Sequence, residues 1–249
     1  MDSPPHKCYH YISNKVIELK SFVHDRNTAY LRRTETVMRP TLENQRVSIR
    51  RDNLRDALIY EIVELEWNML CLMKNEQGQP LDQSGFDSFY AVRYSQHSAM
   101  NSDTIGLYKS DLNVAAHTDR NLMAEKYAYM KDPGSFVIDP GLKPLIDQIV
   151  PLMLQSQESF AAKYPALAGA GRAFDTAEDS APMDVYITSE LITKTEPTLQ
   201  MVLRDIKLNP DYIKDIFEVF VSFYGQESLD KAEVLTSSQQ MKPCRGATL

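Results

Sequence analysis

Two charged side chains fall on helical faces that are otherwise apolar. The spacing of apolar residues predicts a helix over Leu54–Met73, and at about 100° per residue Glu66 lies in the middle of its apolar arc. A second predicted helix, Asp87–His97, places Arg93 among aromatic residues in the same way. An unpaired buried charge costs several kcal/mol, so each needs an opposite charge or a polar cavity. We therefore predict that Glu66 and Arg93 meet inside the protein, as an ion pair or around a ligand.

These two residue types suit a binding and acid–base site. Arg93 would anchor a carboxylate or another anionic group of a substrate through two parallel hydrogen bonds. Glu66 would act as a general base or bind a cationic group such as a guanidinium, with its pKa set by burial and by Arg93. The alternative is an ion pair that only fixes the packing of the two helices, and the sequence leaves both interpretations open.

Five further residues complete the predicted site. Glu125 and Tyr127, on the predicted helix 119–131, would join Glu66 in a catalytic role. Gln96, Arg120 and Arg172 would join Arg93 in binding the substrate. Glu125 falls at the edge of an apolar face, so a surface salt bridge is its alternative role. Arg172 falls in a predicted loop, where it could simply be solvated.

The elements that must position these residues are helices. Strand patterns are nearly absent, and helical periodicity recurs along the chain, which predicts an all-α protein with one irregular helical bundle. Pro151 predicts an interruption or kink, and the Ala- and Gly-rich residues 165–182 predict an irregular loop with a functional role. We divide the chain into a basic extension (1–55), a helical domain (56–235) and a tail (236–249). The predicted helices are 12–33, 54–73, 87–97, 103–116, 119–131, 139–163, 183–195, one beginning near 197, 212–224 and 227–235.

Composition and motifs exclude several classes of protein. Three Cys residues without a Cys-x-x-Cys pair predict neither a disulfide framework nor a zinc site, and Glu61 and Glu64 lack the His that a di-iron motif needs. Only 9 Gly and no phosphate-binding loop are present, so we expect no metal and no cofactor. No apolar run reaches about 18 residues and the N-terminus has no apolar leader, so we expect a cytoplasmic protein without a membrane span.

Charge is unevenly distributed along the chain. The net charge is −7, but residues 1–55 hold eleven Lys and Arg against six Asp and Glu. The remainder is therefore strongly acidic. A basic segment is typical of docking to an anionic partner, and we consider tRNA as a partner of residues 1–55. The alternative is a solvated extension that offsets the acidic domain.

From Asp56 to about Val234 the chain resembles a helical domain-of-unknown-function family of bacteria and fungi. One departure lies at residues 83–87, where the family has consecutive acidic residues and an aromatic. The segments that carry the resemblance are Glu66-Trp67-Asn68-Met69, Arg93-Tyr94-Ser95-Gln96, Arg120-Asn121-Leu122, Glu125-Lys126-Tyr127-Ala128 and a later stretch with Lys163-Tyr164-Pro165, Arg172, Glu178-Asp179, Tyr186 and Glu190-Leu191.

The resemblance implies an all-α fold and a biosynthetic setting. Fungal relatives belong to secondary-metabolite pathways, and some are associated with the synthesis of arginine-containing cyclodipeptides from aminoacyl-tRNA. We therefore predict an enzyme of the transferase or synthase type, acting on a small polar substrate in a helical-bundle pocket by acyl transfer or peptide-bond formation. The alternative is a non-catalytic helical interaction or regulatory protein, in which the same residues are internal supports.

Overall fold

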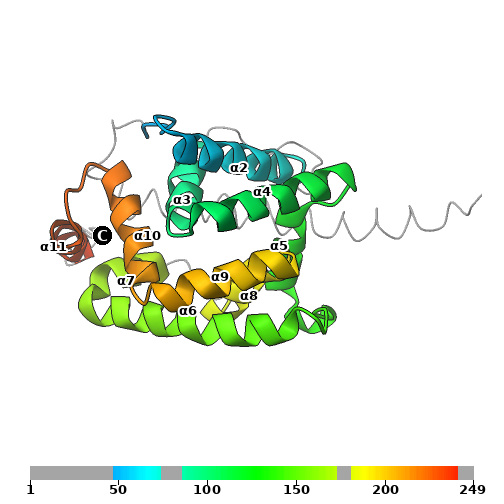
Figure 1. The fold of residues 1–249 in the computed structure, drawn as a ribbon. Helices are drawn as coiled ribbons and strands as arrows, with labels where there is room; N and C mark the ends of the chain where they lie inside the picture. Colours follow the sequence, from blue (N-terminus) through cyan, green and yellow to red (C-terminus); the bar gives the residue numbers. More distant parts are fainter. Residues whose placement is uncertain (1–46, 74–85, 173–180, 241–249) are drawn as a thin grey trace, which may run out of the picture.

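A computed structural model describes residues 47–73, 86–172 and 181–240 of the chain (Figure 1). These residues form ten α-helices and one short 3₁₀ turn and contain no strand, so the all-α prediction is confirmed. The helix predicted over 12–33 lies outside the described residues. The elements are α2 (Leu54–Cys71), α3 (Phe86–Ser98), α4 (Ser102–His117), α5 (Leu122–Lys131), η2 (Pro133–Ser135), α6 (Lys143–Lys163), α7 (Pro165–Arg172), α8 (Met183–Leu191), α9 (Glu196–Leu208), α10 (Tyr212–Phe223) and α11 (Leu229–Gln240).

The helices form two groups that face each other (Figure 1). In one group α2 packs against α3 and α4, and in the other α6 packs against α7, α8 and α9. Helix α5 contacts both α2 and α8, and α10 contacts both α3 and α6, so these two helices connect the groups. The main hydrophobic core lies between them, with a smaller cluster where α6, α7, α10 and α11 meet. Residues of α3 and α8 therefore meet in the interior although they are far apart in the sequence.

Local sequence signals explain where several helices begin and end. Asn53 and Asn121 cap α2 and α5, each accepting a hydrogen bond from the backbone N–H three residues later. The helix predicted from Asp119 begins instead at Leu122, because Asp119 has a left-handed φ of 55° that no helix can continue. Gly225, with a φ of 70°, follows the end of α10, as its position in the sequence predicts.

Two predicted elements differ from the structure. Helix α6 continues through Pro151 without interruption. Residues 165–172, predicted to be irregular, form helix α7, and the rest of that predicted loop up to 180 lies outside the described residues. Pro165 suits the first turn of a helix, and the Glu233 carboxylate accepts the backbone N–H groups of Ala166 and Leu167, each at 2.8 Å. The cap of α7 thus comes from a distant helix.

The last helix is longer than predicted. Helix α11 ends at Gln240 rather than at residue 235, so it takes in the first residues of the predicted tail. Thr236 is buried there and donates a hydrogen bond to the carbonyl of Ala232, which extends the packed face of the helix.

Asp205 connects α9 to the beginning of α4. Its carboxylate is buried and accepts hydrogen bonds from the Thr104 hydroxyl (2.6 Å) and from the backbone and side-chain N–H groups of Asn101 (2.9 and 2.6 Å). Burial raises the pKa of Asp205, but these hydrogen bonds outweigh it and leave the pKa below its ordinary value. The ionised carboxylate therefore stabilises the fold.

Replacing Asp205 should destabilise the protein in a pH-dependent manner. Asp205→Ala leaves three donors without their acceptor, so we expect a loss of about 2–4 kcal/mol in the free energy of unfolding at pH 7. Because the folded pKa is lowered, the contribution is present above about pH 4 and is lost as the pH falls below it. Urea denaturation at pH 7 and pH 3 measures both effects.

The matched control is Asp147→Ala, which removes an exposed carboxylate; among the described residues it pairs with Lys143, one helical turn away. Its effect should stay within about 0.5 kcal/mol. An equal loss in the two variants would contradict the role assigned to Asp205.

Candidate functional site

Glu66 and Arg93 form an ion pair in the interior, as the sequence predicts. Glu66 on α2 is 0% exposed and Arg93 on α3 is 5% exposed. Arg93 donates from Nε to Oε2 of Glu66 at 2.8 Å and from Nη2 to Oε1 at 2.5 Å. The two helices pack directly against each other, which brings these oppositely charged side chains together.

Every N–H of the Arg93 guanidinium is engaged. Besides its two bonds to Glu66, Arg93 donates from Nη1 and Nη2 to the Glu190 carboxylate (2.8 and 3.2 Å) and from Nη1 to Oε1 of Gln96 (2.7 Å). A guanidinium has five N–H donors, and five hydrogen bonds are formed. Arg93 therefore has no donor left to anchor a substrate anion unless it releases a protein carboxylate.

The carboxylate of Glu66 is equally saturated. In addition to Arg93, its Oε1 accepts the Tyr108 hydroxyl at 2.7 Å and its Oε2 accepts Nε2–H of His97 at 3.1 Å. The ammonium of Lys126 lies 3.6 Å from Oε1 and bonds Tyr108 and Glu190 at 3.1 and 2.9 Å. We call this set the internal charge cluster: Glu66, Arg93, His97, Tyr108, Lys126 and Glu190.

The ionisation of the cluster follows from its contacts. Burial raises the pKa of Glu66, but the charges of Arg93 and Lys126 and the neighbouring His97 overcome this and hold the pKa well below its ordinary value. Burial lowers the pKa of His97, so its imidazole is neutral at neutral pH. Because its pKa is low, the Glu66 carboxylate is a weak base, and both of its oxygens already accept hydrogen bonds. It is therefore poorly suited to remove a proton from a substrate.

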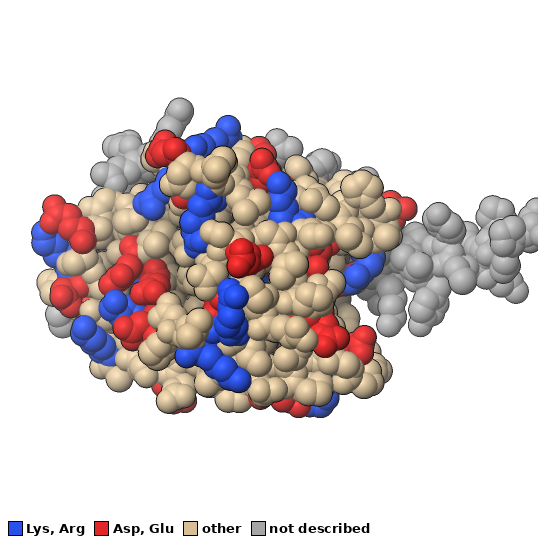
Figure 2. Space-filling model, viewed as in Figure 1, with Lys and Arg blue, Asp and Glu red and all other residues tan. Residues whose placement is uncertain are grey.

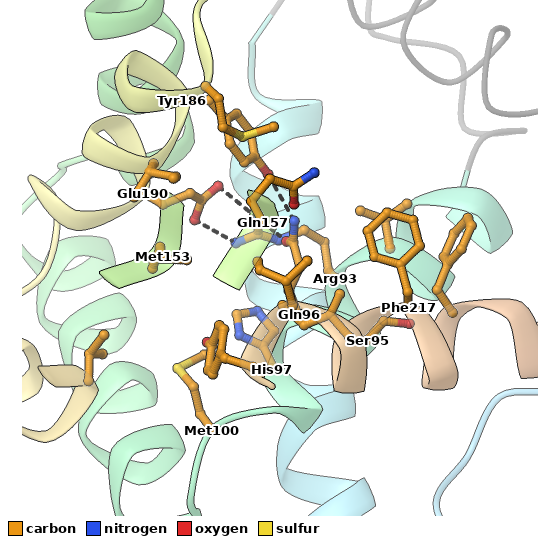
Figure 3. Close-up of a pocket in the computed structure, with 18 of the residues that line it drawn as sticks. Arg93, Ser95, Gln96, His97, Met100, Met153, Gln157, Tyr186, Glu190 and Phe217 are labelled. Carbon is orange, nitrogen blue, oxygen red and sulfur yellow. Dashed lines mark hydrogen bonds and ion pairs between the residues drawn. The ribbon is translucent and has the colours of Figure 1, made fainter. Parts of the chain in front are cut away.

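A cavity of about 230 Å³ lies beside the cluster, between α3 and helices α6, α7, α8 and α10 (Figure 3). Most of its wall is apolar, and the charged and polar side chains gather at one part of it. The polar lining residues are Arg93, Ser95, Gln96, His97, Gln157, Tyr186, Glu190, Lys194 and Tyr212, and the apolar ones include Met100, Met153, Leu167, Ala170, Ile187, Leu191, Ile216, Phe217 and Phe220.

Two of these lining residues have polar atoms without a hydrogen-bond partner among the described residues. His97 donates from Nε2 to a carboxylate, so its Nδ1 is an acceptor, and within the described part of the chain it is buried without a hydrogen bond. Gln157 on α6 is 7% exposed, and among the described interactions its amide forms no hydrogen bond. Buried polar groups are normally satisfied, so these two side chains have hydrogen-bonding capacity left at the cavity wall.

Lys194, which follows the end of α8, lines the cavity, and the pKa of its amine is strongly lowered. It is 6% exposed and its Nζ lies 4.3 Å from the centre of the Tyr108 ring. Burial and the positive charges of Lys126 and Arg93 lower the pKa of Lys194 to about 7, although Glu190 and Glu66 act in the opposite direction. An amine near its titration midpoint at neutral pH can carry a charge or accept a proton.

The structure separates the residues predicted for the site. Arg93 and Gln96 line the cavity, and the amide of Gln96 donates to the Tyr186 hydroxyl at 2.8 Å (Figure 3). Glu66 lies behind Arg93 and does not line the cavity.

The other predicted residues lie elsewhere. Arg120 and Glu125 form an exposed ion pair at 2.7 Å, and Tyr127 packs partly buried against the main core. None of these three lines the cavity. Arg172 ends α7, and its side chain lies outside what the structure describes. Their catalytic and binding roles stay predictions.

Sequence reasoning missed three charged residues of this region. Lys126 had a readable signal, because Leu122, Met123 and Tyr129 lie one turn away on α5 and all are buried with it. Glu190 falls at the edge of an apolar face and was not assigned a role. Lys194 lies within the predicted helix 183–195, but α8 ends at Leu191, so the periodicity of that helix does not place its side chain.

Part of the basic N-terminal segment packs on the bundle. Arg50 lies 4.4 Å from the centre of the Phe223 ring and bonds Ser222, and Arg51 lies 3.5 Å from that of Tyr60. Arg55 donates to the carbonyls of Ser98 and Met100. On the face shown in Figure 2, side chains of both charges are interspersed. The remaining basic residues of the segment lie before residue 47, outside the described part.

The described residues contain neither a metal-binding group of side chains nor a membrane-spanning helix. Among the described residues, no group of three or more His, Cys, Asp or Glu side chains is placed to hold a metal ion. No helix in the described ranges is long and apolar enough to cross a membrane.

Residues 56–234 match the family described as "Protein of unknown function (DUF4125)". This match covers more than half of the chain, so the protein belongs to that family. The matched range contains α3 to α10 and all of α2 except its first two residues, and therefore both the charge cluster and the cavity. No curated protein and no solved structure matches the chain.

A double-mutant cycle should measure the strength of the Glu66–Arg93 pair. Glu66→Gln and Arg93→Met each leave buried charges uncompensated, so we expect each to cost about 3–5 kcal/mol. The double variant leaves Glu190 balanced by Lys126 and should cost less than the sum of the single variants. Thermal and urea denaturation give these values.

The control cycle uses Glu125→Gln and Arg120→Met, the same residue types in an exposed pair. Its coupling should be about 0–1 kcal/mol. Similar coupling in the two cycles would contradict the importance of the buried cluster.

Removing Lys194 should change how stability depends on pH. Because its folded pKa is lowered to about 7, the unfolded chain binds the proton more tightly above that pH. The wild type should therefore gain stability relative to Lys194→Met between about pH 7 and 9. The difference between their free energies of unfolding should rise by at most about 1.4 kcal/mol per pH unit. Lys231→Met, which removes an exposed lysine, should show no such slope. Parallel slopes for both variants would show that Lys194 titrates normally.

Proposed function

We propose that this protein is a biosynthetic enzyme that acts on a small molecule held in the cavity between α3, α6, α7, α8 and α10. One observation carries the proposal: an apolar cavity at whose wall several polar side chains converge, including His97 and Gln157, whose Nδ1 and amide form no hydrogen bond among the described residues. Such cavities, with a few convergent polar groups and a perturbed pKa, are the usual form of a substrate site. The apolar wall favours a substrate with an apolar portion over a wholly polar one.

In this proposal Glu66 and Arg93 act as positioning residues. Their hydrogen-bonding capacity is used within the protein, and Arg93 holds Glu190 and Gln96 at the cavity wall. The groups that contact the substrate are then Gln96, His97 and Lys194, which line the cavity. Burying the charges of the cluster is costly, and fixing the side chains at the cavity wall is a role that explains why the cluster lies beside the site.

The reaction class we favour is transfer of an acyl group from an activated ester, such as aminoacyl-tRNA, to an amine. The ester bond breaks, an amide or peptide bond forms, and the amine's proton passes to the hydroxyl group that leaves. The mostly apolar wall of the cavity favours an acyl group over water, and a bound substrate that fills the cavity would displace water and so protect an activated acyl group from hydrolysis. Ser95 lines the cavity, but its hydroxyl donates to the Ala91 carbonyl at 2.6 Å within the helix and is not paired with a base. We therefore propose direct transfer without an acyl-serine intermediate.

The biological setting follows from the resemblance described above. It favours a step of secondary metabolism of the type that makes arginine-containing cyclodipeptides, with tRNA as a partner of residues 1–55. The tRNA partner stays a prediction, because most of that segment lies outside the described residues.

The alternative, a non-catalytic interaction protein, would call for a broad apolar surface. Within the described ranges, the exposed large apolar side chains lie on separate elements, for example Leu54 on α2, Val114 on α4 and Leu208 on α9. This distribution does not favour the alternative.

Filling the cavity should abolish the activity without unfolding the protein. Ala170→Leu adds bulk to the cavity wall, whereas Ala116→Leu makes the same change on the exposed face of α4. In a producing strain that lacks the gene, wild type and Ala116→Leu should restore the product. Ala170→Leu should leave a precursor accumulated, as measured by mass spectrometry of metabolites, and its melting temperature should be close to that of the wild type.

Full restoration by Ala170→Leu would count against a substrate in the cavity. Unchanged metabolites after deletion of the gene would overturn the enzymatic function.

A further inference from the structure

We infer that the cavity binds a compound with an apolar body and a single carboxylate, and that Lys194 receives the carboxylate. This inference rests on the proposed function, because it names the substrate class for the same cavity. It assigns a binding role to a residue that lies outside the saturated charge cluster.

The charges of the buried groups do not balance around Lys194. Glu66 and Glu190 supply two negative charges, and Arg93 and Lys126 supply two positive ones that pair with them. Lys194 is a further buried amine, and no carboxylate of the described residues forms an ion pair with it. A buried ammonium is stable only when it is paired, so an anion entering the cavity would complete the balance.

The geometry leaves Lys194 able to bond a ligand. Its Nζ donates to the carbonyl oxygen of Glu190 at 2.5 Å and lies over the ring of Tyr108. An ammonium has three N–H donors, and this is the single hydrogen bond that the described residues give it. Lys194 also lines the cavity, so the remaining donors are within reach of a bound molecule.

The ligand needs an apolar body as well as an anion. Apolar side chains from α6, α8 and α10 also line the cavity, including Met153, Ile187, Ile216 and Phe217. Phe217 lies on the apolar side of the cavity, away from Glu190 (Figure 3). A free inorganic anion would leave this surface uncovered, whereas a short aliphatic or aromatic acid would bury it at about 25 cal/mol per Å². At about 230 Å³ the cavity suits an acid of this size rather than a long-chain lipid.

The proton on Lys194 provides a specific signature of binding. The groups that face it are Tyr108 on α4, Lys126 on α5, Glu190 on α8, and Arg93 and Glu66 behind them on α3 and α2. Burial is the main cause that lowers its pKa to about 7; the charges of Lys126 and Arg93 lower the pKa as well, and those of Glu190 and Glu66 raise it. A carboxylate would raise that pKa, so binding above neutral pH should take up a proton.

Isothermal titration calorimetry with three probes of equal chain length tests the inference: octanoate, octanol and octylamine. The full-length wild type should bind octanoate at least about tenfold more tightly than octanol at pH 6.5. Titrations at pH 8 in two buffers of different ionisation enthalpy should show uptake of close to one proton for octanoate and none for octanol.

Lys194→Met should remove both the preference for octanoate and the proton uptake. Because the buried amine lowers stability at neutral pH, this variant should fold at least as well as the wild type, and Lys194→Gln provides a second, polar replacement. Lys231→Met, which removes an exposed charge on α11, should keep both properties.

Equal binding of octanol and octanoate, tighter binding of octylamine, or no binding of octanoate at millimolar concentration would each overturn the inference. So would a retained preference in Lys194→Met or Lys194→Gln. These outcomes are separate from the test of the proposed function: if Ala170→Leu still blocks product formation, the cavity is the site but its ligand is not a carboxylate.

Discussion

The carboxylate of Glu66 is ionised and wholly excluded from water, and this condition constrains the packing of the bundle around it. Its stability depends on donors from three other helices: Arg93 and His97 on α3, Tyr108 on α4 and Lys126 on α5. Each donor must come within hydrogen-bond or ion-pair distance, so α2, α3, α4 and α5 are held in one arrangement. Through Arg93 and Lys126 the same network reaches α8, and it thereby joins the two groups of helices across the interior.

Groups whose hydrogen bonds are all used within this network have a structural role, and groups with hydrogen-bonding capacity left can have a functional one. A guanidinium with five bonds and a carboxylate with four have little left to offer a substrate, however conspicuous they are in the sequence. The groups with unused capacity lie at the edge of the network, where it meets the cavity: Nδ1 of His97, the amide of Gln157 and the amine of Lys194. The cluster thus holds the wall of the cavity, and ligand recognition falls to these neighbours.

Patterns within single helices predicted much of the fold and part of the site. The projection of α2 and α3 placed Glu66 and Arg93 on buried faces, because helical geometry links positions three and four residues apart. The same projection of α5 would have found Lys126. It could not find that Pro165 begins a helix, since the acceptor that caps α7 is Glu233 on α11. Nor could it show that Arg120 and Glu125 lie away from the cavity, because a position at the edge of a helix face does not reveal which other helix packs next to it.

Helical periodicity is a local property and the cost of burying a charge is a general one, so the amino-acid sequence is enough to predict a bundle of helices in which Glu66 and Arg93 find opposite charges. How those charges are shared depends on the packing of the helices. Glu190 and Lys194 come from about a hundred residues further along the chain than Arg93, and no local pattern encodes such a meeting. The packing of α3 against α8 and α10 also creates the cavity, since its volume and its unsatisfied polar atoms exist only when all of these helices are in place.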